Sequence, residues 1–215
     1  GVFQSLDGVI QAGGGPTEDP TGGFAHGGWL PQFFDEEVGL AIDKLFARGY
    51  DLLLGRRTYD IFAAYWPYVE GEAAAMGEAF TRVGKYVLTR GDAPLDWANS
   101  HRLASIENLA ELKAGDGPDL LIQGSSTLYP QLLAAGLLDQ LVLMTFPLVL
   151  GGGKRLFGES TPGKAFRSIE HRVTPKGAVI ATYEPAGELS YGWAGPPVDS
   201  ERERERQHRM AEGTW

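Results

Sequence analysis

The chain has 215 residues, a length that fits one α/β domain and leaves little room for a second. It is 43% hydrophobic and 22% charged, and it has no cysteine, which excludes disulfides, thiolate metal sites and cysteine nucleophiles. The net charge of −9 is offset by no basic stripe, so nucleic acid is not an expected partner. No apolar run approaches the roughly 18 residues of a membrane-spanning helix. We therefore expect a cytoplasmic protein that does not enter the membrane.

The amino-terminal half is expected to alternate between strands and helices. Residues 2–11 read as a strand interrupted by a turn, and residues 12–28 as a long loop rich in Gly, Pro and Thr. Such a loop inside a compact domain is usually functional or mobile. The apolar spacing then predicts helices over 34–48, 58–65 and 73–83, with a buried strand at 51–54.

The carboxyl-terminal half continues this alternation. Strands are expected at 85–89, 119–122 and 141–146, helices at 106–113 and 127–135, and an antiparallel hairpin from strands 166–173 and 178–183. Together the elements predict an α/β fold with one mostly parallel sheet covered by helices on both faces. Residues 1–184 are expected to form this single domain, and residues 185–215 a Gly/Pro-rich, mixed-charge tail. Within the tail, residues 201–209 are expected to be a solvated helix or a disordered segment.

Two short turns follow the buried strands and have the chemistry of phosphate sites. Gly55 ends the apolar run 51–54, and Thr58 is expected to cap the next helix. Gly124 ends the run 120–123 and precedes three hydroxyl residues. In open α/β sheets, ligands bind at the carboxyl ends of strands, where glycine lets the backbone approach and a helix N-terminus attracts anions. The hydroxyl residues of the second turn are Ser125, Ser126 and Thr127.

Arginines add positive charge beside the first turn. Arg56 and Arg57 lie within it, and Thr89 and Arg90 end the intervening strand. A guanidinium fork suits a terminal phosphate monoester such as the 2′-phosphate that distinguishes NADP from NAD. The dinucleotide fingerprint G-x-G-x-x-G is absent. The two turns therefore predict a site that binds NADPH without the G-x-G-x-x-G fingerprint.

An ordered set of motifs resembles the dihydrofolate reductase superfamily. It is most similar to the branch named for the C-terminal reductase domain of the bifunctional riboflavin-biosynthesis enzyme, over roughly residues 2–184. The resemblance implies a central mixed sheet of about eight strands, NADPH as cofactor, and hydride transfer to a pyrimidine- or pterin-like ring. It also implies a homodimer, for which the residues themselves indicate no interface. The motifs are Ser5-Leu6-Asp7-Gly8, Leu54-Gly55-Arg56-Arg57-Thr58-Tyr59, Val87-Leu88-Thr89-Arg90, Ile122-Gln123-Gly124-Ser125 and Leu148-Val149-Leu150-Gly151-Gly152-Gly153.

The resemblance also implies roles for individual residues. Arg56 would meet the 2′-phosphate, Arg57 and Thr58 the pyrophosphate, and Thr89 and Arg90 the adenosine end. The segment from Gly124 to Leu128 would lie under the pyrophosphate and the nicotinamide. Loop 12–28 falls where the family has its mobile active-site loop. The implied substrate is 5-amino-6-(5-phosphoribosylamino)uracil, an intermediate of riboflavin biosynthesis.

Carboxylates and aromatic residues are the candidates for contacting the substrate. Asp7, Asp35 and Glu36 are placed to anchor a ring or relay a proton. A turn role is the alternative for Asp7, and helix capping is the alternative for Asp35. Trp29, Phe33, Phe34 and Tyr65 could stack on a flat heterocycle, although aromatic residues at such positions often belong to the core. The four histidines show no ligand spacing, so no metal site is expected.

Two further functions compete with the riboflavin-type reductase. The first is dihydrofolate reductase activity on the same fold. The second is a non-catalytic nucleotide-binding protein, because the Asp-Asn-Pro segment that riboflavin reductases carry after the first turn is absent here, where Phe62 and Ala63 stand instead. Arg56, Arg57 and Thr58 favour retained cofactor binding in either case.

Overall fold

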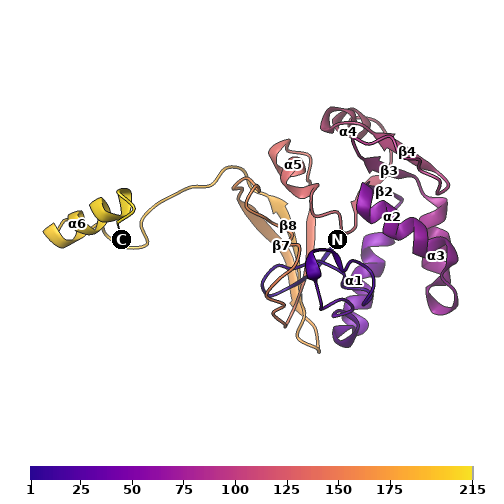
Figure 1. Ribbon diagram of the computed structural model, residues 1–215, viewed down its shortest axis with the longest axis horizontal. Helices are drawn as coiled ribbons and strands as arrows, with labels where there is room; N and C mark the ends of the chain where they lie inside the picture. The colour runs from indigo at the N-terminus through magenta and orange to yellow at the C-terminus, as the bar shows by residue number, and fades with distance from the viewer. Residues whose placement is uncertain (215) are drawn as a thin grey trace.

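The computed structural model describes residues 1–214 and is drawn in Figure 1. Its strands are β1 (Val2–Ser5), β2 (Tyr50–Gly55), β3 (Lys85–Leu88), β4 (Ser100–Leu103), β5 (Asp119–Ile122), β6 (Leu141–Phe146), β7 (Phe166–Val173) and β8 (Val179–Pro185). Its α-helices are α1 (Glu36–Phe46), α2 (Arg56–Tyr65), α3 (Ala74–Arg82), α4 (Ile106–Lys113), α5 (Tyr129–Ala134) and α6 (Glu201–Ala211). Short 3₁₀ turns cover Thr21–Gly23, Pro31–Phe33, Trp66–Tyr68 and Gly71–Ala73.

The strands form two hydrogen-bonded ladders. The first has the order β4-β3-β2-β5, and all its neighbours run parallel. The second has the order β1-β6-β8-β7, in which β1 is parallel to β6 and β8 is antiparallel to both neighbours. The Gly1 nitrogen donates to the Ile122 carbonyl (3.3 Å), which brings β1 beside β5 where the ladders meet. The predicted mostly parallel mixed sheet of about eight strands, with its C-terminal antiparallel hairpin, is confirmed.

Helices cover both faces of the first ladder. Neighbouring residues of β2 point to opposite faces of the sheet, so they pack against different helices. Leu53 packs in one core cluster with Leu109 of α4 and with residues of α5. Leu52 and Leu54 pack in another cluster with residues of α2 and α3. All three leucines are at most 2% exposed, as a strand buried on both faces requires.

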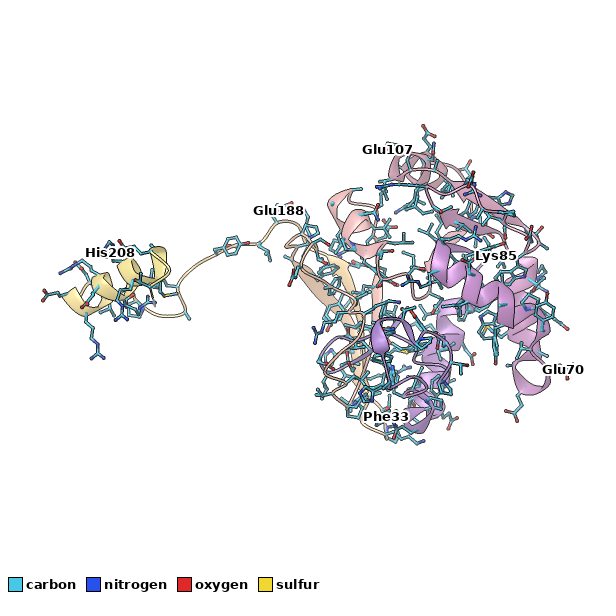
Figure 2. The ribbon with its side chains drawn as sticks, viewed as in Figure 1. Phe33, Glu70, Lys85, Glu107, Glu188 and His208 are labelled. Carbon is cyan, nitrogen blue, oxygen red and sulfur yellow. The ribbon has the colours of Figure 1, made fainter. Side chains whose placement is uncertain are left out.

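The second ladder has an aromatic core of its own. Phe146, at the end of β6, is fully buried, and its ring lies 5.8 Å from Trp29, 6.1 Å from Phe33 and 6.2 Å from Phe3 between centroids. Val38 and Ala41 of α1 pack into the same cluster. Phe33 is labelled in Figure 2, at the opposite end of the view from Glu107 of α4. Helix α1 and the loop before it are therefore anchored to the second ladder.

Several elements of the structure differ from those expected. Strand β4 was not predicted, because Ser100–Leu103 is a polar edge strand with exposed His101 and Arg102. The second half of the strand expected over residues 2–11 is instead a single antiparallel bridge between Val9 and Arg155. Helix α5 begins at Tyr129 rather than at 127, after a turn. Helix α2 begins at Arg56, two residues earlier than expected.

Helix α6 stands apart from the domain. Figure 1 shows α6 at the end of an extended linker, and none of residues 185–214 is buried. Helix α6 has Ser200 as its N-cap, which accepts from the Glu203 N–H (3.1 Å). This matches the solvated-helix alternative. Backbone pairing between Ala165 and residues 186–187 carries the hairpin slightly past the predicted boundary at 184, and Trp215, the last residue of the predicted tail, lies outside the described residues.

Candidate functional site

The first strand-to-helix turn lies at the carboxyl end of β2. Gly55 is the N-cap of α2 and has an extended backbone, and Arg56, Arg57 and Thr58 are the first three helical residues. The prediction that Thr58 caps the helix is therefore wrong, because Thr58 stands inside the first turn. N–H groups of a first turn have no acceptor within their helix, and the helix dipole places partial positive charge there. The turn keeps the expected character of an anion site.

The second turn follows β5 and closely approaches the first. Gly124 and Ser125 both have left-handed backbones, with φ of +57° and +53°. A Cβ placed on Gly124 would lie 3.2 Å from Thr58 Oγ1, so a side chain at position 124 would crowd the first turn. Left-handed backbone is uncommon for a residue other than glycine, and it costs about 1 kcal/mol or more. Ser125 must therefore be held in place by its neighbours.

Ser125 links the two turns. Its backbone N–H donates to Thr58 Oγ1 (3.0 Å), and its Oγ accepts from the Gly55 N–H (3.0 Å) and donates to the Gln123 carbonyl (3.1 Å). Ser125 is only 8% exposed, so these bonds are largely shielded from water. They hold the left-handed conformation and fix the spacing of two turns that lie 70 residues apart in the chain. The turns form one unit, which we call the cradle (residues 55–58 and 124–128).

The hydroxyl residues predicted to bind the cofactor differ in whether their hydroxyl groups are free to hydrogen-bond a ligand. The Ser125 hydroxyl is used within the protein, whereas the Thr58 hydroxyl still has its hydrogen to donate. Within residues 1–214, the hydroxyls of Ser126 and Thr127 make no hydrogen bond, and Thr127 is exposed. Leu128 is 3% exposed in the core, and its N–H donates to the Ser125 carbonyl. The free hydroxyls at the cradle are those of Thr58, Ser126 and Thr127.

Arg56 is held by contacts within the protein. Its Nε donates to Asp60 Oδ2 (3.0 Å), and its Nη2 lies 2.8 Å from Asp60 Oδ1. Its Nη1 donates to the carbonyls of Ala93 (2.8 Å) and Pro94 (3.0 Å). The hydrogen bond to Asp60 raises the pKa of Arg56 above its ordinary value. Sequence reasoning missed Asp60, although its position four residues after Arg56 in a helix was a usable signal.

Two other arginines at the same edge are unengaged. Gly55 pairs with Leu88 in the ladder, so Thr89 and Arg90 leave β3 next to the first turn. Thr89 Oγ1 accepts from the Gly91 N–H (3.2 Å). In the part of the chain that the structure describes, Arg57 and Arg90 are exposed and make no hydrogen bond or ion pair. Their guanidinium groups are available to a ligand.

Asp7 lies after the carboxyl end of β1 and is saturated with donors. It accepts from the Ser5 hydroxyl (2.6 Å) and from the N–H groups of Leu150 (3.1 Å) and Gly151 (2.9 Å). Arg155 Nη2 lies 3.6 Å from its Oδ2. The Ser5 bond and the backbone bonds lower the pKa of Asp7 to about 2, against an ordinary value of 3.8. The carboxylate is ionised at neutral pH, and it holds the β1 turn against the loop after β6.

Asp35 and Glu36 begin α1. Asp35 is the N-cap, accepting from the Val38 N–H (3.0 Å), and it also accepts from the Lys176 N–H (3.0 Å) in the β7–β8 turn. Desolvation acts to raise the pKa of Asp35, but these hydrogen bonds outweigh it and lower the pKa. Glu36 is exposed and makes no hydrogen bond or ion pair within residues 1–214. The geometry supports the capping alternative for Asp35.

The four candidate aromatic residues divide by exposure. Trp29 is 4% exposed, and its indole N–H donates to the Gln11 carbonyl (2.9 Å). Phe33 packs on Phe146 in the core of the second ladder. Phe34 is 37% exposed beside Phe3, and Tyr65 is 54% exposed at the end of α2. Phe34 and Tyr65 are thus the candidates with ring surface open to a ligand.

Loop 12–28 is held in place by residues that sequence reasoning did not select. The Gln11 amide donates to the carbonyls of Asp19 and Thr21 (both 2.9 Å), and Lys154 Nζ pairs with Asp19. Between this loop and the glycine triplet is a pocket of about 390 Å³. It is lined by Gln11, residues 21–26 and residues 152–154, including His26. The sequence could not indicate that Gln11 holds this loop, because its hydrogen-bond partners Asp19, Thr21 and Lys154 are not its neighbours in the chain.

Residues 1–214 contain no group of three or more His, Cys, Asp or Glu side chains that could hold a metal ion. Nor does any described helix have the length and apolar character needed to cross a membrane.

The family model of the RibD C-terminal domain matches residues 1–180. The chain belongs to this family. The resemblance inferred from the ordered motifs is thereby confirmed, and the membership covers both turns of the cradle. Among curated proteins, the uncharacterized protein YyaP of Bacillus subtilis (strain 168) is 27% identical over 138 residues, which are 61% of this chain and 72% of YyaP.

Solved structures show the same fold. A protein named for riboflavin biosynthesis from Shewanella sp. PV-4 gives a TM-score of 0.63 at 23% identity, covering 86% of this chain and 96% of its own. A pyrimidine reductase-like protein from Corynebacterium diphtheriae gives 0.56 at 13% identity, covering 87% and 90%. Dihydrofolate reductase from Enterococcus faecalis, complexed with NADP(H) and RAB-propyl, gives a TM-score of 0.54 at 18% identity, covering 86% of this chain and 94% of its own. The chain therefore has the dihydrofolate reductase-like fold.

Proposed function

We propose that this member of the RibD C-terminal domain family is an NADPH-dependent reductase whose substrate is 5-amino-6-(5-phosphoribosylamino)uracil or a closely similar pyrimidine. The observation that carries the proposal is the cradle. Ser125 joins two strand-end turns, and free hydroxyl and guanidinium groups surround them. Membership of a reductase family and the NADP(H) complex of the Enterococcus faecalis neighbour support the choice of cofactor.

The residues present fit a dinucleotide phosphate. The first-turn N–H groups of α2 and the hydroxyls of Thr58, Ser126 and Thr127 would hold the pyrophosphate. Exposed arginines beside the first turn would take the terminal phosphate. When bound, NADPH supplies the hydride. The chain's part is to orient the nicotinamide and the substrate ring, with Phe34 and Tyr65 offering apolar surface for the latter.

The predicted carboxylates are poorly suited to donating a proton. Asp7 has a pKa of about 2, Asp35 is the cap of α1, and Glu36 makes no contact that would position it. We infer that the proton required to reduce a C=N or C=O bond comes from solvent rather than from these side chains. Substitution of Glu36 by Gln should then leave the pH profile of turnover unchanged.

NADPH oxidation, followed by absorbance, tests the proposal. We expect turnover with the aminouracil ribosyl phosphate, and dihydrofolate is assayed in parallel for the second reductase activity. NADPH binding without turnover of either substrate would favour the alternative of a non-catalytic nucleotide-binding protein. That alternative is supported by Asp7 and Asp35, whose carboxylates are engaged in hydrogen bonds within the fold. A chain that binds no NADPH at all would refute both.

A further inference from the structure

Strand β1 occupies only part of the space between its two neighbours in the sheet. It pairs with β6 from Val2 onwards, so the first two residues of β6, Leu141 and Val142, face no strand on that side. On the other side, β5 has a ladder partner only in β2. Between the amino-terminal ends of β5 and β6 lies a pocket of about 480 Å³, whose lining includes Gly1, residues 119–122 and residues 140–142. Figure 1 shows the N-terminus there, in the middle of the domain. We call this pocket the strand gap.

The backbone of β5 presents hydrogen-bonding groups to the strand gap. A strand residue points its N–H and C=O to the same side, and the C=O of Ile122 points toward Gly1, whose nitrogen donates to it. The N–H of Ile122 and both backbone groups of Leu120, two residues earlier, therefore point toward the gap as well. A row of such groups at a strand edge is a template for a further strand.

Apolar side chains line the strand gap on both faces of the sheet. On one face are Leu109 of α4 and Tyr129 of α5, which belong to the core cluster that also holds Val2. On the other face is Leu45 of α1, whose Cδ1 would lie 2.6 Å from a Cβ on Gly1. Strand residues alternate between the faces. A residue placed before Gly1 would therefore join the cluster around Val2, and the one before it would point toward α1.

Two polar groups at the strand gap are buried at a cost. The Gly1 ammonium donates to Ile122 (3.3 Å), and desolvation lowers its pKa to about 5, against an ordinary value of 8.0. An amide N–H at this position would donate the same bond without a buried charge. Tyr129 is 1% exposed, and its hydroxyl has no hydrogen-bond partner within residues 1–214. Both groups favour an occupant with a polar backbone over a purely apolar ligand.

We propose that the strand gap is a slot for an extended segment on the amino-terminal side of Gly1, which continues β1 between β5 and β6. The segment runs parallel to both neighbours along residues 119–121 of β5, and its side chains on the α4–α5 face are apolar. A continuous segment fits better than a free peptide or a second copy, because Gly1 stands at the mouth of the slot and β1 is already in register with β6.

Filling the slot would join the two ladders along the whole of β5. Strand β5 leads to the second cradle turn at Gly124, and β1 leads to the turn of Asp7. The longer β1 would thus fix the spacing between the carboxyl edges of the two ladders. This inference does not rest on the proposed function.

Short amino-terminal extensions of the full chain test the slot. The extension Ile-Thr-Val would direct its two apolar side chains toward the α4–α5 face and its threonine toward α1. Gly-Ser-Gly is the matched control, because both extensions have the same length and both replace the Gly1 ammonium by an amide. Relative to Gly-Ser-Gly, we expect Ile-Thr-Val to raise the Tm by roughly 5–10 °C. It should also slow hydrogen exchange of the Ile122 amide by roughly tenfold or more.

A third extension, Asp-Thr-Asp, tests the register. It would place carboxylates against the apolar α4–α5 face and should give no gain in Tm over Gly-Ser-Gly. Equal Tm values for Ile-Thr-Val and Gly-Ser-Gly, or a gain without protection of Ile122, would overturn the slot. A second copy is the competing occupant: the chain without an extension would then be a dimer by light scattering, with the Ile122 amide already protected. None of these measurements uses NADPH, so failure of the slot is distinguishable from failure of the proposed function.

Discussion

The two ladders of the sheet treat their polar side chains in opposite ways. At the carboxyl edge of the first ladder, the side chains of Arg57, Arg90, Ser126 and Thr127 make no hydrogen bond or ion pair within residues 1–214. At the corresponding edge of the second, Asp7 is saturated by Ser5 and by backbone N–H groups. Unused hydrogen-bonding capacity marks a place for a ligand, whereas satisfied capacity marks a place where the fold holds itself together. We therefore expect the edge of the first ladder to bind the ligand and the edge of the second to stabilise the fold.

Substitution of Asp7 is the strongest test of this difference. Asp7→Ala should lower the free energy of unfolding by about 3 kcal/mol, because it removes a charged acceptor and leaves the N–H groups of Leu150 and Gly151 without their partner. Chemical denaturation measures the change. Asp43→Ala, at an exposed residue of α1 whose side chain makes no hydrogen bond or ion pair within residues 1–214, should change stability by no more than about 0.5 kcal/mol. Equal effects of the two substitutions would contradict the supporting role.

Acid should remove the same contribution. The folded-state pKa of Asp7 is about 2 and its ordinary value is 3.8, so its stabilising effect is complete above 3.8 and is lost as the pH falls towards 2. The shift corresponds to about 2 kcal/mol. The stability difference between wild type and Asp7→Asn, measured by denaturation at a series of pH values, should shrink across this window. A difference that stays constant below pH 3.8 would show that the carboxylate charge is not responsible.

Within the cradle, neighbouring serines should separate support from binding. Ser125→Ala removes the link to the Gly55 N–H and should cost about 1–2 kcal/mol of stability as well as cofactor affinity. Ser126→Ala should leave stability unchanged and weaken only NADPH binding. Thermal unfolding and a binding titration on both variants make the comparison. If Ser126→Ala destabilises the fold as much as Ser125→Ala does, the first ladder is less free for ligands than its contacts indicate.

The smallest effect is expected for Tyr65, the exposed aromatic residue at the end of α2. Tyr65→Ala should raise the KM for the substrate by a few-fold, as for loss of one aromatic contact of roughly 1 kcal/mol, without changing stability. Steady-state kinetics measure this. The matched control is Tyr68→Ala, which removes a tyrosine that is 75% exposed three residues away. Similar KM changes for both tyrosines would place the substrate elsewhere.

Much of the fold was predictable because its signals are local. Strands β2 and β5 contain apolar runs, with Gly55 at the end of the first and Gly124 two residues after the second, and their positions identified both cradle turns. Strand β4 escaped prediction because an edge strand that exposes His101 and Arg102 lacks the apolar pattern. Local sequence also favoured Thr58 as a cap, whereas the structure uses its hydroxyl as a long-range acceptor for Ser125.

The free or engaged state of each site residue was not predictable in the same way. Arg56 and Arg57 are adjacent and chemically identical, yet Arg56 is engaged by Asp60 on its own helix and by the carbonyls of Ala93 and Pro94, 37 and 38 residues away. Asp7 gains its low pKa from the nearby Ser5 hydroxyl and also from N–H groups more than 140 residues distant. Such contacts depend on the tertiary arrangement, so sequence reasoning located the edge of the sheet but could not say which residues there remain available.

The hydrogen bonds of Ser125 to both turns determine how the effects of substitutions in the two turns combine. Because Thr58 Oγ1 and the Ser125 N–H share one hydrogen bond, and Ser125 Oγ also holds the Gly55 N–H, substitutions at positions 58 and 125 act on one network rather than on two sites. Their effects should not add: Thr58→Ala combined with Ser125→Ala should cost less than the sum of the single changes. A family member that alters one turn would therefore be expected to alter the other with it, and the two positions would covary although they lie 67 residues apart.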